Sequence, residues 1–226
     1  MNLTPANIAA QLSKGLAPLY FVYGDEPLIL AETLDLIRAA ARKQGFEERE
    51  SHTVIDTRFN WDKLQAGINN LSLFAVRKIV EVRLVTGKPG VDGSAAIVEL
   101  LNNLPPDTLW IFTAPKLDKT NASSKWAKTL LGKAVCVEVR PLIPAHLPAW
   151  IDQRMRAVGL NGDAEAIQLL ADRVEGNLLA AQQEISKLVL LAQGRRVSAD
   201  LVRQSTADGA RFDVYQLADA ALAQDA

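Results

Sequence analysis

The sequence predicts an α/β domain followed by an all-α domain: a mainly parallel sheet of five strands with flanking helices, and then a small helical bundle. Up to about Pro141, short apolar runs alternate with segments whose apolar residues recur every three or four positions. This pattern is typical of buried strands separated by helices, and such strands pair in parallel. Pro141, Pro144 and Pro148 then interrupt the chain, and every periodic segment after them has helical spacing. Helices on both faces of a sheet, followed by a bundle, satisfy both patterns.

Five short segments have the composition of strands. The first, 19–23, is an apolar aromatic run between Pro18 and Gly24, and 79–85 alternates along most of its length. All five are expected in one sheet: 19–23, 51–56, 79–85, 109–114 and 134–139.

Apolar stripes identify the helices. One stripe consists of Leu30, Leu34, Ile37 and Ala41, with charged residues between them. Asn60 is a candidate cap for a second helix, whose stripe is Trp61, Leu64, Ile68 and Leu71. The other expected helices are a short one at Ile8 and Leu12, then 94–104, 122–131, 147–158, 167–174 and 178–192, and one after the candidate cap Ser198.

Composition excludes several classes of protein. A formal net charge of −1 over 226 residues argues against a general polyanion binder. The one cysteine, Cys136, forms neither an internal disulfide nor a Cys-rich zinc site, which favours a reducing cytoplasm. No apolar run approaches the ~20 residues that cross a bilayer, and the N-terminal segment lacks the basic start of a signal peptide. A cytoplasmic protein without membrane contact is expected.

The turn after the first strand, 23–29 (YGDEPLI), lies where an α/β sheet usually binds its ligand. A phosphate-binding loop needs a glycine-rich backbone, a lysine and a serine or threonine. This turn has one glycine, two carboxylates that repel phosphate, and a proline that has no N–H group. Neither GxxxxGK[ST] nor GxGxxG occurs in the chain. We therefore expect no nucleotide, cofactor or metal.

The sequence also predicts no catalytic residues. His52 and His146 are far apart, and neither lies in an HExxH motif or beside a plausible nucleophile, so each is interpreted as a surface or linker imidazole. Cys136 lies within an apolar strand, which predicts a buried and unreactive thiol. The carboxylates form no pair suited to acid–base chemistry.

Periodicity leaves two interpretations of Leu73 and Phe74 open. Leu73 follows Leu71 by two positions, about 200° around a helix, and so lies off the buried stripe. The two side chains either point outward together at the tip of this element or turn inward as the chain enters the strand 79–85. Periodicity alone favours the inward orientation.

Three landmarks resemble a known family. The run 69–75 (NNLSLFA), followed by the basic residues Arg77 and Lys78 and a strand, resembles the delta subunit of the bacterial DNA polymerase III clamp loader. So does the opening 19–38 (LYFVYGDEPLILAETLDLIR), with its degenerate phosphate loop. The segment 175–178 (EGNL), which leads into a long helix, resembles the family's second domain. The match covers nearly the whole chain in order.

The resemblance implies a truncated, non-ATPase relative of the AAA+ proteins. The expected parts are an AAA+-like α/β domain over 1–140, a helical lid domain over 141–210, and the beginning of a missing helical collar domain over 211–226. In the family the collar carries most assembly contacts. This fragment is therefore expected to be monomeric and unable to join a stable loader complex.

The resemblance also implies how the protein acts. In the family, a Leu–Phe pair fills a hydrophobic pocket on the sliding clamp, the beta subunit, and the same subunit opens the clamp for loading onto DNA. Carried over, this plug is Leu73 and Phe74, which favours the outward orientation, and Asn69, Leu71 and Ser72 support it. Clamp-binding motifs commonly begin with Gln where this chain has the shorter Asn69, which puts the role of that residue in question.

Further partners follow from the resemblance: the other loader subunits through the collar domain, and primed DNA only within the assembled loader. A locally basic stretch is interpreted first as a solvated face and second as a DNA-phosphate contact; it comprises Lys116, Lys119, Lys125, Lys128 and Lys133. Within 175–178 a structural interpretation is preferred, in which Gly176 bends the chain, Asn177 caps the next helix and Leu178 packs.

Alternative functions remain at this point. An ATPase subunit of the loader needs a working phosphate loop, and that subunit and the delta-prime subunit usually carry a cysteine-rich zinc module, which one cysteine cannot supply. A nucleotide-dependent enzyme with an atypical phosphate loop is a second class, which nucleotide titration tests. A stand-alone DNA-binding module is a third, which a steep salt dependence of DNA affinity would support.

Overall fold

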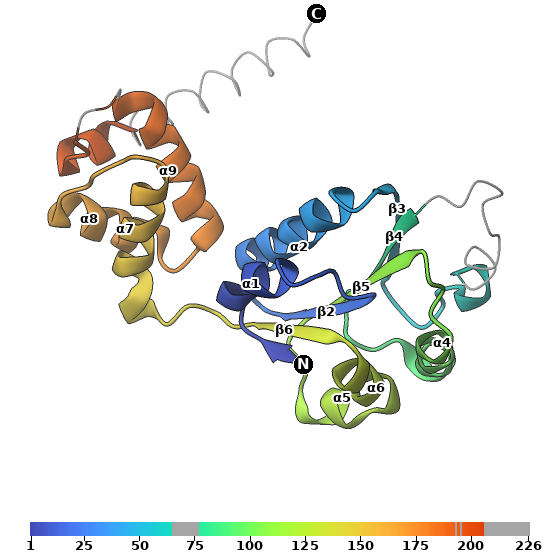
Figure 1. Ribbon diagram of the computed structural model, residues 1–226. Helices are drawn as coiled ribbons and strands as arrows, with labels where there is room; N and C mark the ends of the chain where they lie inside the picture. The colour runs from blue at the N-terminus through green and yellow to red at the C-terminus, as the bar shows by residue number, and fades with distance from the viewer. Residues whose placement is uncertain (65–76, 193, 195, 206–226) are drawn as a thin grey trace, which may run out of the picture. The chain divides into compact units, whose positions relative to one another are not determined.

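The computed structural model describes residues 1–64, 77–192, 194 and 196–205 (Figure 1). The chain forms two compact units, Met1–Pro141 and Leu142–Ala226, which are treated separately below.

The first unit is built on one sheet with the strand order β1-β6-β2-β5-β4-β3, and every pairing in it is parallel. The strands are β1 (Asn2–Leu3), β2 (Leu19–Gly24), β3 (Phe46–Val54), β4 (Arg77–Leu84), β5 (Thr108–Ala114) and β6 (Val135–Val139). The predicted fold class, a parallel sheet with flanking helices and then a helical part, is confirmed.

The predicted number of strands is wrong, because the sheet has six strands and not five. The additional strand is β1, in which Asn2 and Leu3 pair with Cys136 and Val137 of β6. The backbone N–H of Cys136 donates to the carbonyl of Met1 at 2.8 Å. Two residues are too few to show an alternating pattern, so only their pairing identifies the strand.

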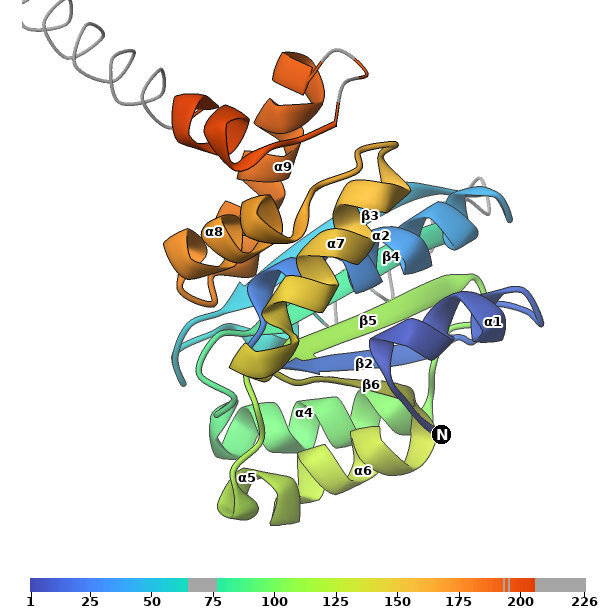
Figure 2. The same cartoon turned by 90° about the vertical axis from the view of Figure 1, so that its left-hand side faces the viewer.

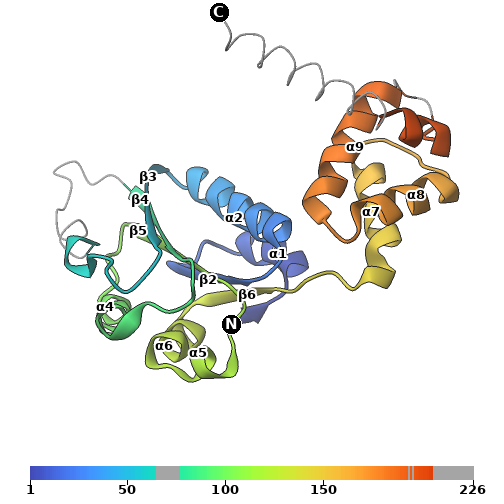
Figure 3. The ribbon, with the colours of Figure 1, turned by 180° about the vertical axis from the view of Figure 1, so that it is seen from behind.

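Helices cover both faces of the sheet (Figure 2). Helices α1 (Ile8–Leu12) and α2 (Pro27–Arg42) lie on one face, and α4 (Gly90–Asn102), α5 (Lys119–Ser123) and α6 (Lys125–Lys133) lie on the other, as the view from behind also shows (Figure 3). Each layer has its own buried cluster. Ile37 represents the cluster under α1 and α2, and Trp110 the cluster under α4 and α6.

Several element boundaries differ from the prediction, and two of these differences have a visible cause. The expected helix 122–131 is two helices, because Ser124 has an extended backbone at ψ 156°. Strand β3 begins at Phe46 instead of residue 51. The residues 46–50 lie in a strand at the sheet edge and are largely exposed, so their charged side chains hide the alternating signal.

The second unit is helical. Its helices are α7 (Leu147–Ala157), α8 (Ala164–Val174) and α9 (Leu178–Ala192), with a short 3-10 helix η2 (Pro144–His146) before them and helical residues 199–205 after them. Ile151, Leu170 and Ile185 are buried in its core, one from each helix. Among the described residues of both units, no helix is long and apolar enough to span a membrane.

Candidate functional site

The predicted plug, Leu73 and Phe74 with Asn69, Leu71 and Ser72, lies outside the described residues, as does the predicted stripe residue Ile68. The chain on either side of residues 65–76 is described, and it shows how this part of the molecule is attached to the domain.

The N-terminal flank begins with the predicted cap. The side-chain oxygen Oδ1 of Asn60 accepts a hydrogen bond from the backbone N–H of Lys63 at 2.9 Å, and residues 61–64 are helical. Trp61 and Leu64 are 5% and 3% exposed and belong to the core cluster on the α4 face of the sheet. The first half of the predicted stripe therefore faces the core.

The Trp61 indole is held by two neighbours. It makes an edge-to-face contact with Phe59, with ring centroids 4.9 Å apart. It also lies against Gly93 of α4 so closely that a Cβ atom on Gly93 would come within 2.7 Å of the indole atoms Cε2 and Cζ2. The helix that leads into residue 65 is thereby fixed to α4 at its first turn.

The C-terminal flank is the start of β4. The Arg77 guanidinium donates from Nη1 to the carbonyl of Gln44 at 2.9 Å and lies 5.7 Å from the centre of the Phe46 ring. Its Nε is 3.7 Å from a carboxylate oxygen of Asp107. Lys78 approaches Glu50 at 3.7 Å. Arg77 and Lys78 therefore both contact residues of β3 or of the loops beside the sheet.

The turn after β2 is closed by its own side chains. Gly24 has φ +146°, and a Cβ atom there would lie 1.7 Å from the carbonyl oxygen of Val139, so only glycine permits the close approach of β2 to β6. Asp25 accepts at Oδ1 from the backbone N–H of Lys116 at 2.9 Å. Glu26 caps α2 by accepting from the N–H of Leu28 at 3.3 Å.

These contacts leave the turn unsuited to phosphate. Burial raises the pKa of the Glu26 carboxyl, and the hydrogen bond from Leu28 opposes that shift. The carboxyl occupies the helix N-terminus, where a phosphate would otherwise bind. Asp25 is exposed beside it and Pro27 opens the helix without an N–H group. The geometry agrees with the composition of the turn.

A buried ionic cluster that the sequence did not predict joins α2 to β3 and β4. Glu81 of β4 is only 8% exposed and accepts from Arg38 of α2 in a two-pronged arrangement, with Nε and Nη2 each 2.8 Å from a carboxylate oxygen. Arg49 of β3 binds the same carboxylate at 2.8 Å. Burial alone would raise the pKa of Glu81, but the two guanidinium groups overcome this effect and lower it.

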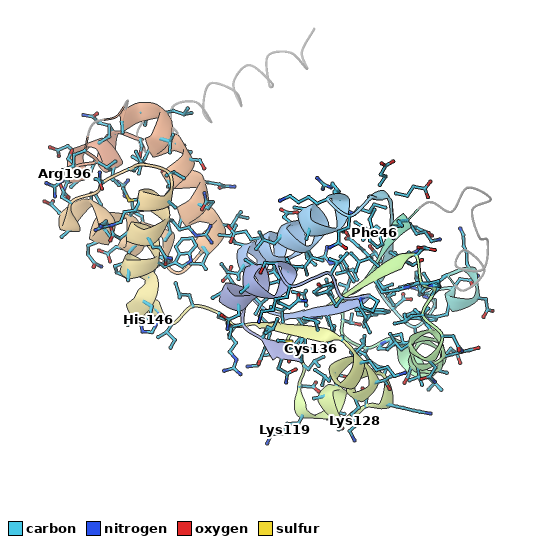
Figure 4. The ribbon with its side chains drawn as sticks, viewed as in Figure 1. Phe46, Lys119, Lys128, Cys136, His146 and Arg196 are labelled. Carbon is cyan, nitrogen blue, oxygen red and sulfur yellow. The ribbon has the colours of Figure 1, made fainter. Side chains whose placement is uncertain are left out.

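The basic stretch is exposed along its length. Lys116, Lys119, Lys125, Lys128 and Lys133 all lie on the surface. The labelled pair Lys119 and Lys128 points away from the body of the unit (Figure 4). The ammonium group of Lys133 instead donates to the carbonyl of Leu101 at 2.9 Å and to Asn102 at 2.7 Å, at the C-terminal end of α4. Contact with DNA remains a prediction for all five.

The other candidates have structural surroundings. Cys136 is 1% exposed, and burial raises the pKa of its thiol (Figure 4). His52 lies 2.8 Å from a carboxylate oxygen of Glu50, and His146 is exposed in η2. No three His, Cys, Asp or Glu side chains in the described part of the chain are grouped to hold a metal ion.

The landmark 175–178 has the expected structural roles. Glu175 and Gly176 both have positive φ angles, 47° and 86°, which turn the chain between α8 and α9. Asn177 accepts at Oδ1 from the N–H of Ala180 at 3.0 Å and caps α9. Leu178 is 2% exposed and packs in the core.

Comparison with known proteins places this fold. The chain is similar to the Bacillus subtilis DNA clamp loader delta protein, with a TM-score of 0.61 and 22% identity over 89% of this chain and 62% of that one. It is also similar to the Thermotoga maritima RuvB Holliday junction branch migration motor, with a TM-score of 0.55 and 12% identity over 88% and 67% of the two chains. These likenesses confirm the AAA+-like fold.

Sequence relatives are more specific. The chain is 32% identical over 222 residues to the DNA polymerase III subunit delta of Escherichia coli (strain K12), and 30% identical over 224 residues to that of Haemophilus influenzae. Each alignment covers 98% of this chain and 64% of the relative, so the chain spans about two thirds of the length of these relatives. The family model described as "DNA polymerase III, delta subunit" matches residues 20–140, more than half of the 226 residues. The chain therefore belongs to the DNA polymerase III delta subunit family.

Proposed function

We propose that this protein is the clamp-opening subunit of a bacterial clamp loader, which binds the sliding clamp through Leu73 and Phe74 and takes part in loading it onto DNA. Membership of the delta subunit family is the observation that carries the proposal. The sequence supports the position of the plug through the run 69–75.

The anchored flanks support a mechanical role for this segment. Trp61 is buried against Gly93 on one side, and Arg77 is bonded to the rim of the sheet on the other. A force on the segment between them would therefore pass into α4 and β4, and so into the whole domain. In this role Leu73 and Phe74 bind the clamp, and the domain to which they are attached resists deformation.

The closed turn after β2 supports a subunit that acts without nucleotide of its own. Glu26 caps the helix that would receive a phosphate, and Asp25 adds a second carboxylate. The proposed protein is therefore a non-catalytic member of the DNA polymerase III holoenzyme. Its further partners would be the other loader subunits and, within the assembly, primed DNA in the cytoplasm.

The test is the affinity of this protein for purified sliding clamp, with and without the plug. Burying two large apolar side chains contributes about 1.5–3 kcal/mol each, and such central anchors usually dominate an interface. The double variant Leu73→Ala, Phe74→Ala should bind the clamp at least ~100-fold more weakly. Calorimetry or surface plasmon resonance measures the change.

A matched control removes the same kind of surface elsewhere. Leu179 and Leu190 of α9 are 49% and 77% exposed, so Leu179→Ala, Leu190→Ala should leave clamp affinity unchanged. Melting temperatures test the inward orientation of Leu73 and Phe74. If both side chains were buried, truncating them would destabilise the fold by several kcal/mol and lower the melting temperature. A plug variant that unfolds early, or that keeps its clamp affinity while folded, would show that Leu73 and Phe74 are core residues.

A further inference from the structure

Helices α5 and α6 present a basic face to solvent, formed by Lys119, Lys125 and Lys128. The inner side of α6 is buried, with Trp126 and Leu130 only 3% and 0% exposed in the core cluster under α4 and α6. Lys125 and Lys128 are exposed on the other side of the helix, one turn apart. Lys119 and Lys128 project from the same side of the unit (Figure 4). The three ammonium groups therefore lie on one outward surface.

The charge of this basic face is almost unopposed. The segment 119–137 contains no Asp or Glu. The carboxylate that precedes it, Asp118, caps α5 by accepting from the backbone N–H of Asn121 at 2.6 Å and from its side-chain amide at 3.3 Å. Within the described part of the chain, none of the three ammonium groups has a hydrogen-bond or ion-pair partner. The face thus concentrates positive charge in a protein whose net charge is −1.

The other two members of the basic stretch are engaged within the domain. The ammonium group of Lys133 is held by hydrogen bonds at the C-terminal end of α4. Lys116 lies near Glu138, whose pKa is lowered first by the hydrogen bond from Arg140 and also by the charge of Lys116. The structure therefore separates two committed lysines from the three uncommitted lysines of the basic face.

The surroundings of the basic face favour a phosphate backbone over a protein partner. Protein interfaces usually depend on aromatic or aliphatic anchors, and no large apolar side chain of α5 or α6 is exposed. The one aromatic residue of these helices, Trp126, is buried and is not available to stack on a base. The hydroxyl groups of Thr120 and Ser123 lie at exposed positions between the lysines. Ammonium and hydroxyl groups without a stacking platform suit double-stranded DNA, whose phosphates face outward.

We propose that the basic face is a sequence-independent contact for the phosphates of duplex DNA, and that it operates in this subunit without nucleotide or other loader subunits. This contact goes beyond the proposed function, in which DNA is met within the assembled loader, and rests on that function only for the choice of DNA as the polyanion. Lysine suits this role because its flexible stem lets the ammonium group reach the nearest phosphate. Three such contacts give weak, salt-dependent binding that holds the subunit near DNA without fixing its position.

Fluorescence anisotropy of a labelled duplex tests the proposal with the full chain, in the absence of ATP, clamp and other subunits. With three phosphates neutralised, the dissociation constant should be roughly 10–100 μM at about 25 mM salt, and the logarithm of the association constant should fall against log salt with a slope of about −3. Lys125→Gln, Lys128→Gln should reduce the slope to about −1 and weaken binding at least ~10-fold at the lowest salt. Lys125→Arg, Lys128→Arg keeps both charges and should bind like the parent.

The matched control is Lys14→Gln, Lys43→Gln, which makes the same change in net charge at exposed positions after α1 and α2, on the opposite face of the sheet. It should keep the parent affinity within about twofold. Circular dichroism melting confirms that the variants fold. The proposal is overturned by a parent that does not bind duplex at the lowest salt, by equal losses in the two Gln variants, or by tighter binding to single-stranded DNA or to an oligoglutamate peptide.

Clamp affinity, measured in parallel, distinguishes this contact from the proposed function. It should be the same in the parent and in all three double variants, because none of the substituted lysines belongs to the run 69–75. A parent that binds duplex but not the clamp would count against the proposed function and leave the DNA contact standing. A parent that binds the clamp but not duplex would do the reverse.

Discussion

The indole of Trp61 lies directly against the Cα position of Gly93, and there is no room between them for a methyl group. Two segments separated by a strand are joined at this point, because Trp61 opens the helix that leads into residue 65 and Gly93 belongs to α4. Because of this close approach, adding a single methyl group at Gly93 should change the stability of the protein.

Gly93→Ala should destabilise the protein. In an open helix position this substitution is stabilising by about 0.5–1 kcal/mol, but here the new Cβ lies 2.7 Å from the indole. Forcing the ring aside should lower the free energy of unfolding by roughly 1–3 kcal/mol. Gly132→Ala in α6 is the matched control, since a Cβ there meets nothing within 4 Å and should stabilise. Urea denaturation of both variants measures the difference, and two changes of the same sign would contradict the packing argument.

Gly24→Ala should prevent stable folding of the first unit. The substitution places Cβ 1.7 Å from the Val139 carbonyl, so β2 and β6 must separate. The expected loss is more than ~4 kcal/mol, beyond the range of ordinary substitutions. Gly15→Ala measures the cost of backbone strain without a steric clash, because Gly15 has a similar φ of +137° but no atom within 4 Å of a Cβ built there. It should lose only about 1–2 kcal/mol from backbone strain. Equal losses in the two variants would mean that the contact with β6 is unimportant.

Glu81→Gln should remove stability at neutral pH and also change its pH dependence. The folded-state pKa of Glu81 lies below its ordinary value of 4.5. A depressed carboxyl pKa contributes stability that is present above pH 4.5 and is lost as the pH falls through the folded value. The variant should be less stable than the parent by roughly 3 kcal/mol at pH 7, because Arg38 loses its buried charged partner and keeps only the exposed carboxylate of Asp35. The difference should shrink as the pH falls below about 4.5.

Denaturation curves at pH 7, 5 and 3.5 test this expectation. Glu48→Gln is the control on the neighbouring strand, since Glu48 is exposed and makes no ion pair within the described structure. A gap between Glu81→Gln and the parent that widens toward low pH would reverse the sign and refute the assignment.

ATP should not bind the isolated protein. The turn after β2 has no lysine, its helix N-terminus is capped by Glu26, and Asp25 would repel the phosphates. Isothermal titration should show no saturation at sub-millimolar ATP, and no phosphate should be released. Saturable binding in that range would favour the alternative of a nucleotide-dependent enzyme.

Local patterns predicted much of the fold. The stripe from Leu30 to Ala41 identified α2, and the amide side chains of Asn60 and Asn177 were correctly predicted as helix caps. These signals are readable because each arises from residues within a turn or two of one another. The separation of a helical bundle from an α/β part followed in the same way from the change in periodicity.

Contacts between distant segments were not predictable. Glu81, Arg38 and Arg49 come from three elements, and nothing in their spacing indicates that one carboxylate receives both guanidinium groups. Arg83 is likewise ordinary in sequence, and only the strand register places it between Thr53 and Thr113. The candidate plug itself came from the resemblance of 69–75 to a family, since periodicity favoured the opposite orientation.

The order of strands in the sheet also determines when each strand can pair during synthesis. Strand β2 lies between β5 and β6, whose residues follow it by nearly ninety positions or more along the chain. Throughout that interval the nascent LYFVY run has both edges unpaired, which is the condition under which strands associate with the wrong partner. The two residues of β1 wait longer still, because Asn2 pairs with Cys136 of β6. The sheet is therefore completed only after β6 has been synthesised, and any sequence fused to Met1 must leave the pairing of β1 with β6 free.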